Sequence, residues 1–157
     1  MIQIEITDQQ SIAAINPAPL IRLLNDVFVA EGFSTGEVSV ALVDDAKIHE
    51  VNRRFLEHDF PTDVISFRLD EPGSPGSESG MPHLPSSLEG EIVVSVETAA
   101  RMAPENSWCI ESEVLLYCLH GALHLCGFDD LTAGDAQRMR ARETHYLAPL
   151  GLNPIVQ

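Results

Sequence analysis

The sequence contains little positive charge. Its 157 residues include nine lysines and arginines against 24 aspartates and glutamates, which gives a net charge of −15 at pH 7. Proteins that hold nucleic acid usually carry a basic surface, because neutralising phosphates supplies most of the non-specific affinity. Composition alone therefore does not suggest a nucleic-acid partner, and we do not expect DNA as one. An acidic balance can still coexist with a local basic groove, and the arginines form two clusters, Arg53 with Arg54, and Arg138 with Arg140 and Arg142.

Cysteines and long apolar runs are also scarce. The three cysteines are an odd number, at Cys109, Cys118 and Cys126. No apolar run reaches the roughly 20 residues that span a bilayer, and the chain does not open with a basic-then-apolar secretory leader. We therefore expect a cytoplasmic protein with reduced thiols and no membrane partner.

The length and apolar content are typical of one globular domain. Hydrophobic residues make up 45% of the chain, and 157 residues are enough to bury a core, so residues 1–157 are expected to form a single domain. Residues 71–87, EPGSPGSESGMPHLPSS, are rich in glycine, proline and serine and poor in large apolar side chains. This composition predicts a flexible loop within that domain rather than a linker between two.

Apolar periodicity predicts an α+β fold. The expected strands are residues 1–7, 37–43, 64–67 and 88–95, and the expected helices are residues 17–32, 44–57, 96–103, 111–125 and 132–146. Asp44 or Asp45 is expected to cap the second helix, and Thr132 the last. We expect the last two strands to pair as a hairpin within one mixed four-stranded sheet covered by helices.

The stretch YCLHGALHLCGFDD, residues 117–130, has the spacing of a metal site. On a helix, His120 and His124 lie one turn apart on the same face, so a single helix can present two imidazoles to one zinc ion. Gly127 can end the helix in the left-handed conformation, and the turn would bring Asp129 or Asp130 back towards the histidines. The pattern predicts two imidazoles and one carboxylate around a metal cleft at the end of this helix, with a fourth position left for water.

Other readings of these residues remain open. Two histidines at this spacing also occur in helix cores with their ring nitrogens satisfied by neighbours. Zinc peptidases place a glutamate directly after the first histidine as general base, and that position is Gly121, so a small metallopeptidase is less favoured. Cys126 is near enough to be considered as a ligand, although a free cysteine in such a helix is more often a small buried apolar residue.

Two segments resemble the signatures of the bacterial YbeY family of rRNA maturation factors and endoribonucleases. HGALHLCGFDD resembles the motif His-Gly-x-Leu-His-Leu-x-Gly-Tyr-Asp-His, with Phe128 in place of tyrosine and Asp130 in place of the third histidine. PTDVISF, at residues 61–67, resembles the family's second signature. The resemblance implies a YbeY-like domain that holds one zinc ion through His120, His124 and Asp130.

The resemblance also implies a function. It indicates a zinc-dependent endoribonuclease that acts on single-stranded RNA in maturation of the 16S rRNA 3′ end and in ribosome quality control, with the small ribosomal subunit as partner. A bound zinc ion would lower the pKa of a water molecule that it holds, and it would polarise a phosphoryl oxygen of the RNA. The alternative is a non-catalytic assembly factor with a structural metal, which docks a basic ribosomal protein or an assembly GTPase. The acidic balance suits that alternative.

Two functional positions depart from the family pattern. Asp130 adds a negative charge where the family has an imidazole, which makes metal-activated water less acidic. Many members carry an arginine, implicated in RNA cleavage, at the position of Leu56, four residues after Asn52, and a leucine cannot clamp a phosphate. The sequence identifies no general base. Glu113 shares a helix face with His120, and we expect it to pair with an arginine.

Overall fold

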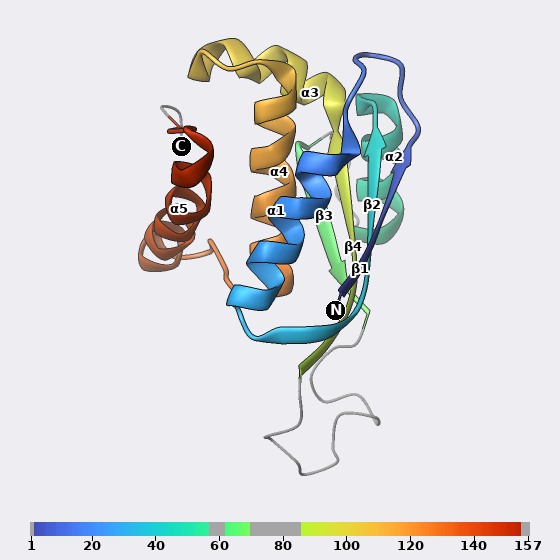
Figure 1. The fold of residues 1–157 in the computed structure, drawn as a ribbon. Helices are drawn as coiled ribbons and strands as arrows, with labels where there is room; N and C mark the ends of the chain where they lie inside the picture. Colours follow the sequence, from blue (N-terminus) through green and yellow to red (C-terminus); the bar gives the residue numbers. More distant parts are fainter. Residues whose placement is uncertain (1, 57–61, 70–85, 155–157) are drawn as a thin grey trace.

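The computed structural model describes residues 2–56, 62–69 and 86–154 and has the predicted order of elements (Figure 1). These elements are β1 (Ile2–Asp8), α1 (Pro17–Ala30), β2 (Phe33–Val43), α2 (Asp45–Leu56), β3 (Val64–Arg68), β4 (Ser86–Ser95), α3 (Val96–Met102), α4 (Ile110–Leu125) and α5 (Ala133–Leu147). Short 3₁₀ helices follow α3 and α5, at Ala103–Asn106 and Ala148–Leu150. Of the predicted loop at 71–87, residues 71–85 lie outside the described residues, whereas residues 86 and 87 belong to β4, so the loop was predicted two residues too long.

The predicted caps are confirmed, and one strand is longer than predicted. Asp44 caps α2, since its Oδ1 accepts a hydrogen bond from the Lys47 N–H at 2.8 Å. Thr132 caps α5 by accepting from the Asp135 N–H at 3.0 Å. β2 begins at Phe33 rather than at residue 37, because residues 33–36 continue to pair with β4 through a local shift of register.

The four strands form one mixed sheet in the order β1-β2-β4-β3. β1 pairs with β2 in parallel, and β2 pairs with β4 in parallel. β3 pairs with β4 in antiparallel register, from Val64 opposite Val94 to Arg68 opposite Gly90. The predictions of a mixed four-stranded sheet and of pairing between the last two strands are therefore confirmed.

Helices cover both faces of this sheet (Figure 1). Successive side chains of a strand point to opposite faces, so β4 contributes to two cores. Ile92 and Val94 pack in the larger core with α1 and α4, whereas Val93 packs with Ile48 of α2 on the other face. α5 packs against α4 on the side away from the sheet. No helix among the described residues is both long and apolar enough to cross a membrane.

α4 is the central helix of the fold. It contacts β3, β4, α1, α3 and α5. An enclosed helix has to be apolar on most sides, and Val114, Cys118, Leu119 and Leu123 are each fully buried. Its C-terminal end is held by the sheet, where the Arg68 Nη1 donates to the Leu125 carbonyl at 3.0 Å. The sheet and its neighbours thus fix the position of the helix that carries both histidines.

Candidate metal centre and adjoining cavity

The end of α4 is set by Gly127, as the sequence predicts. Gly127 adopts a φ of +105°, which side chains other than glycine rarely tolerate. Its N–H donates to the His124 carbonyl at 3.0 Å, and the Phe128 N–H donates to the Leu123 carbonyl at 3.0 Å. This pair of bonds is the Schellman motif, which reverses the chain direction after a helix. The reversal brings the following acidic residues back past the last turn of α4.

Three potential ligand atoms converge where the chain returns. The Nε2 atoms of His120 and His124 lie 3.1 Å apart. The Asp130 Oδ2 lies 3.4 Å from the His120 Nε2 and 3.7 Å from the His124 Nε2. Among the described residues these three form the only group of histidines, cysteines and acids with ligand atoms this close together.

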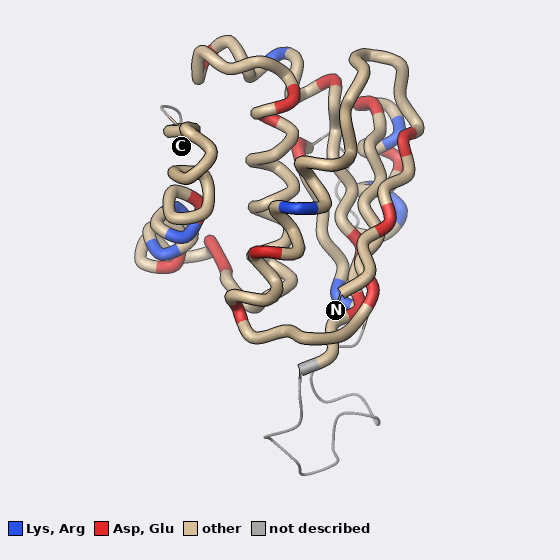
Figure 2. Tube along the Cα trace, viewed as in Figure 1, with Lys and Arg blue, Asp and Glu red and all other residues tan. Residues whose placement is uncertain are grey.

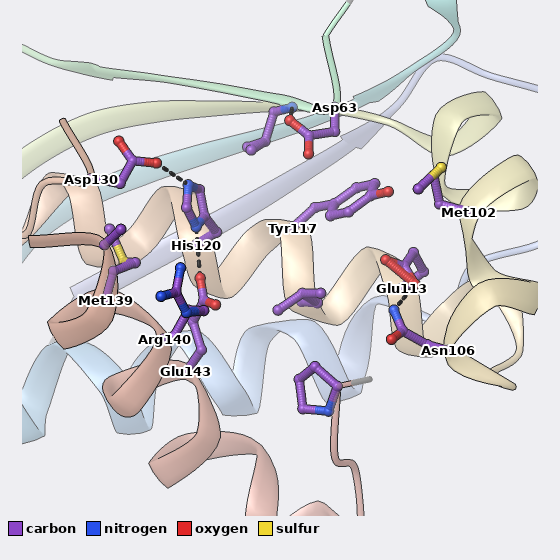
Figure 3. Close-up of a pocket in the computed structure, with 14 residues that line it drawn as sticks. Asp63, Met102, Asn106, Glu113, Tyr117, His120, Asp130, Met139, Arg140 and Glu143 are labelled. Carbon is purple, nitrogen blue, oxygen red and sulfur yellow. Dashed lines mark hydrogen bonds and ion pairs between the residues drawn. The ribbon is translucent and has the colours of Figure 1, made fainter. Parts of the chain in front are cut away.

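Each imidazole is oriented by a hydrogen bond on its other nitrogen. The His124 Nδ1 lies 3.0 Å from the Phe128 carbonyl oxygen, which can only accept, so Nδ1 carries the proton and Nε2 presents a lone pair. The His120 Nδ1 lies 2.6 Å from the Glu143 Oε2 on α5 (Figure 3). Partners of this kind commonly fix the tautomer and direction of metal-binding histidines.

The spacing of the three atoms fits a single metal ion. With metal–ligand distances of about 2.0–2.2 Å, ligand atoms around a tetrahedral zinc ion lie about 3.3–3.6 Å apart. The observed separations of 3.1, 3.4 and 3.7 Å bracket that range. Three lone pairs directed at one another repel unless a cation or a shared proton lies between them, so this donor set suits a divalent ion.

The other ligand candidates from the sequence lie elsewhere. Asp129 is exposed, and its Oδ1 accepts from the Asp130 N–H at 2.7 Å. Cys126 is a free thiol outside the converging group of described residues, and burial raises its pKa to about 12, which disfavours the thiolate that binds metals. Of the two acids left open by the sequence, Asp130 is the one near both imidazoles.

The charge state of His120 depends on Glu143. Burial lowers the pKa of this imidazole, but the hydrogen bond and negative charge of Glu143, together with Asp130 and Asp63, raise it overall. The raised pKa means that a proton competes with a metal for this site, since a ligating histidine has to be neutral.

A cavity of about 370 Å³ opens beside the three atoms (Figure 3). It lies between α4, α5 and the start of β3, and His120 and Asp130 are on its wall. The other charged residues that line it are Asp63, Glu113, Arg140 and Glu143. Its volume is at the small end of ordinary ligand pockets.

The structure corrects the expectation for Glu113. This glutamate is 2% exposed, and it accepts a hydrogen bond from the Asn106 Nδ2 at 3.0 Å rather than pairing with an arginine. Burial raises the pKa of Glu113, and the hydrogen bonds from Asn106 and Tyr117 offset this only in part. Glu113 is therefore a buried acid two turns from His120 with a reduced tendency to ionise.

Asp63, just before β3, both binds the local backbone and lines the cavity. The Asp63 Oδ1 accepts from the Val64 N–H at 2.8 Å, so this carboxylate satisfies a local backbone donor at the start of the strand. Asp63 also lines the cavity opposite His120 (Figure 3). Pro61, the first residue of the segment that resembles the family's second signature, lies outside the described residues.

The first arginine cluster does not reach the cavity. Leu56, Arg53 and Arg54 on α2 are absent from the described residues that line it. Arg54 instead pairs with Glu50 at 3.5 Å and lies over the Phe55 ring. Neither arginine of this cluster is therefore among the described residues on the wall of the cavity.

Gly121 faces the sheet rather than the site. A Cβ atom here would lie 2.8 Å from the Ile92 Cγ2 and 3.2 Å from the Val64 Cγ2. A glutamate in this position would need the Ile92 and Val64 side chains, or the helix itself, to shift, so this packing disfavours the peptidase arrangement of a glutamate after the first histidine.

Sequence reasoning missed the residues that support the site. Neither Glu143 nor the Phe128 carbonyl was predicted as a partner of the histidines, and Arg140 was noted only as a member of the second arginine cluster. The rule that metal-binding histidines usually donate to a carboxylate or carbonyl could have prompted a search for such partners. It could not have selected Glu143, because 22 residues separate it from His120.

Comparisons with known proteins agree with these motifs. A family model described as endoribonuclease YbeY matches residues 3–151. The chain is 42% identical to endoribonuclease YbeY of Moorella thermoacetica over 141 residues, covering 85% of each chain. It is 40% identical to the Desulfitobacterium hafniense protein of the same name, covering 74% of this chain and 73% of that one. The fold resembles the solution structure of TM1509 from Thermotoga maritima, with a TM-score of 0.58, 24% identity, and 96% and 91% of the two chains covered. The chain belongs to the YbeY family.

Proposed function

We propose that this protein is a metal-dependent endoribonuclease that holds one zinc ion through His120, His124 and Asp130. The observation that carries the proposal is the convergence of two oriented imidazoles and one carboxylate, with separations of 3.1, 3.4 and 3.7 Å. Membership of a family described as endoribonuclease YbeY supports the reaction class.

The exposure of the donor set favours a catalytic over a structural metal. The side chains of His120, His124 and Asp130 are 26%, 27% and 40% exposed. Structural zinc sites are closed by four protein ligands, whereas catalytic sites use three and leave a position for water or substrate. Three converging atoms among the described residues match the second arrangement.

The residues around the donor set have separable roles. A zinc ion supplies Lewis acidity towards water and a phosphoryl oxygen. Glu143 and the Phe128 carbonyl hold the two imidazole rings so that both Nε2 atoms are directed to one point. Without these hydrogen bonds the two rings would have to be ordered when the metal binds. The cavity beside His120 provides a place for the part of the substrate next to the reacting phosphate.

The substrate in this proposal is single-stranded RNA, in maturation of the 16S rRNA 3′ end and in ribosome quality control. The partner would then be the small ribosomal subunit, and the activity would be exercised in the cytoplasm. An exposed site suits a polymer that lies across the surface better than a small molecule that has to be enclosed.

Cleavage by zinc-loaded protein tests the proposal. Wild-type protein should cut a single-stranded RNA carrying the 16S 3′ end, and His124→Ala should not. His145→Ala is the matched control, because His145 is an exposed histidine outside the site. Equal cutting by wild type and His124→Ala would reject the proposal.

A second candidate function is docking of a basic protein without catalysis, which the net charge of −15 favours. A basic ribosomal protein or an assembly GTPase would be such a partner. This function predicts binding that survives His120→Ala and weakens with salt, in a protein that does not cut RNA.

A further inference from the structure

Arg140 is the only lysine or arginine among the described residues that line the cavity. It lies on α5, one turn before Glu143, and both residues line the cavity with His120 (Figure 3). The residue is exposed, so a ligand entering the cavity can reach it.

Within the part of the chain that the structure describes, Arg140 has no ion pair that would occupy its charge. Most other cations of the described chain have an acidic partner: Lys47 and Arg54 with Glu50, Arg101 with Asp45, Arg138 with Asp135, and Arg142 with Glu31. Arg140 has no acidic partner within 4.0 Å among the described residues. Its neighbours Arg138 and Arg142 lie about 200° around the helix from it and do not line the cavity.

The charges of the cavity indicate what Arg140 could bind. Asp63, Asp130 and Glu143 place carboxylates around the site. The whole chain carries a net charge of −15, and Figure 2 shows acidic positions distributed over most of the fold. A phosphodiester would be repelled by this surface unless cations offset the carboxylates. A divalent ion offsets part of that charge, and the guanidinium of Arg140 is the only other cation on the described wall of the cavity.

We propose that Arg140 binds a phosphate of the RNA substrate beside the metal, so that α5 supplies the cation that Leu56 on α2 cannot. This inference rests on the proposed function. The planar guanidinium can donate two parallel hydrogen bonds to phosphate oxygens, and it remains charged at any working pH. Arg140 thereby positions the RNA backbone next to the converging atoms of His120, His124 and Asp130.

RNA binding without cleavage tests the role of Arg140 directly. The ligand is a fluorescent single-stranded RNA with every 2′-hydroxyl methylated, its integrity checked on a gel, and the protein is zinc-loaded and full-length. Arg140→Ala should raise the Kd about tenfold, as for loss of one charged hydrogen-bonding contact, and Arg140→Lys should fall between the two. Arg138→Ala is the matched control, since it removes the same charge from the same helix outside the cavity.

Salt dependence distinguishes a phosphate contact from a general loss of charge. The slope of log K against log salt should fall by about 0.7 in Arg140→Ala, the value for one phosphate contact on a single strand, and should not change in Arg138→Ala. With cleavable RNA, Arg140→Ala should raise KM more than it lowers kcat. Its zinc content should equal that of the wild type.

The outcomes separate this inference from the proposed function. Absence of cleavage by wild type rejects the function, whereas the role of Arg140 is judged by binding. Equal Kd values for Arg140→Ala and Arg138→Ala, or no measurable RNA binding by the wild type, would overturn the proposed role of Arg140.

Discussion

The carboxylates of Asp45 and Asp130 lie in polar clusters that differ in their balance of donors and acceptors. At the start of α2, the Asp45 Oδ1 accepts from the Ser95 Oγ at 2.6 Å and from the Thr98 Oγ1 at 2.7 Å. The Asp45 Oδ2 accepts from the Arg101 Nη1 at 2.5 Å. Both oxygens are therefore satisfied within the chain.

When both imidazoles are neutral, as metal binding requires, the cluster around Asp130 contains acceptors without matching donors. Its Oδ2 faces the Nε2 atoms of His120 and His124, whose protons are directed to Glu143 and Phe128 on the opposite nitrogens. A cluster with satisfied oxygens joins α2 to the junction of β4 and α3, whereas a cluster of converging acceptors is suited to a cation from outside. The number of hydrogen-bond donors around each carboxylate, more than the residue type, distinguishes the structural Asp45 from the functional Asp130.

The largest expected effect is loss of the metal on removal of its proposed carboxylate ligand. Asp130→Ala should lower zinc affinity at least about 100-fold, more than the usual effect of changing a supporting residue. Asp129→Ala, the neighbouring acid outside the converging group, should retain a full equivalent of zinc. Elemental analysis and competitive chelator titration measure both. If Asp130→Ala retained a full equivalent of zinc, Asp130 would not be a metal ligand and its contrast with Asp45 would fail.

The next effect comes from the residue that orients His120. Glu143→Gln keeps the shape of the side chain but weakens the hydrogen bond to the His120 Nδ1, and zinc affinity should fall about 10- to 100-fold. Chelator titration at neutral pH detects this change. An unaltered affinity would mean that His120 is oriented by its packing alone.

Changes in the cluster around Asp45 should lower the stability of the fold and leave metal binding unchanged. Asp45→Asn should lower the free energy of unfolding by about 1–3 kcal/mol at pH 7, because it removes charged hydrogen bonds from a partly buried site. Its zinc content should remain that of the wild type. Chemical denaturation and elemental analysis on the same samples provide both readings.

The same variant carries a pH signature. Burial raises the pKa of Asp45, but the hydrogen bonds from Ser95, Thr98 and Arg101 lower it overall, below its ordinary value of 3.8. The carboxylate therefore stabilises the fold above pH 3.8, and that contribution is lost as pH falls through the lower, folded-state value. The stability difference between wild type and Asp45→Asn should be complete at neutral pH and shrink below pH 3.8. A difference that grows on acidification would contradict this account.

The smallest effects concern two glycines at helix ends. Gly127 and Gly32 have φ values of +105° and +97°, and an added Cβ would meet nothing within 4 Å at either. Changing either to alanine should cost about 1–2 kcal/mol of stability through backbone strain alone. Only Gly127→Ala should also weaken zinc binding, because the turn after α4 places Phe128 and Asp130. Equal zinc affinity in the two variants would show that this turn tolerates the strain without moving the site.

Local patterns in the sequence were sufficient for the elements and for most of the donor set. Alternating and helical periodicities, with caps at Asp44 and Thr132, predicted the order of strands and helices. The spacing of His120 and His124 and the glycine at position 127 depend on geometry within one helix and its turn, which involves only neighbouring residues. Asp129 and Asp130 are part of the same short stretch, so the return of an acid towards the histidines follows from a local turn, but only the structure shows that Asp130 is the acid near both imidazoles.

The chain of residues by itself thus determined the fold class and the local pair of histidines with a following acid. Only the tertiary structure decided which groups support them, because Glu143 and Arg140 come from a different helix and Asp63 from the start of β3. It also decided that Gly121 packs on β4 and that Glu113 bonds Asn106. Packing between elements sets these relations, and no periodicity within a single segment encodes which faces of separate helices will meet.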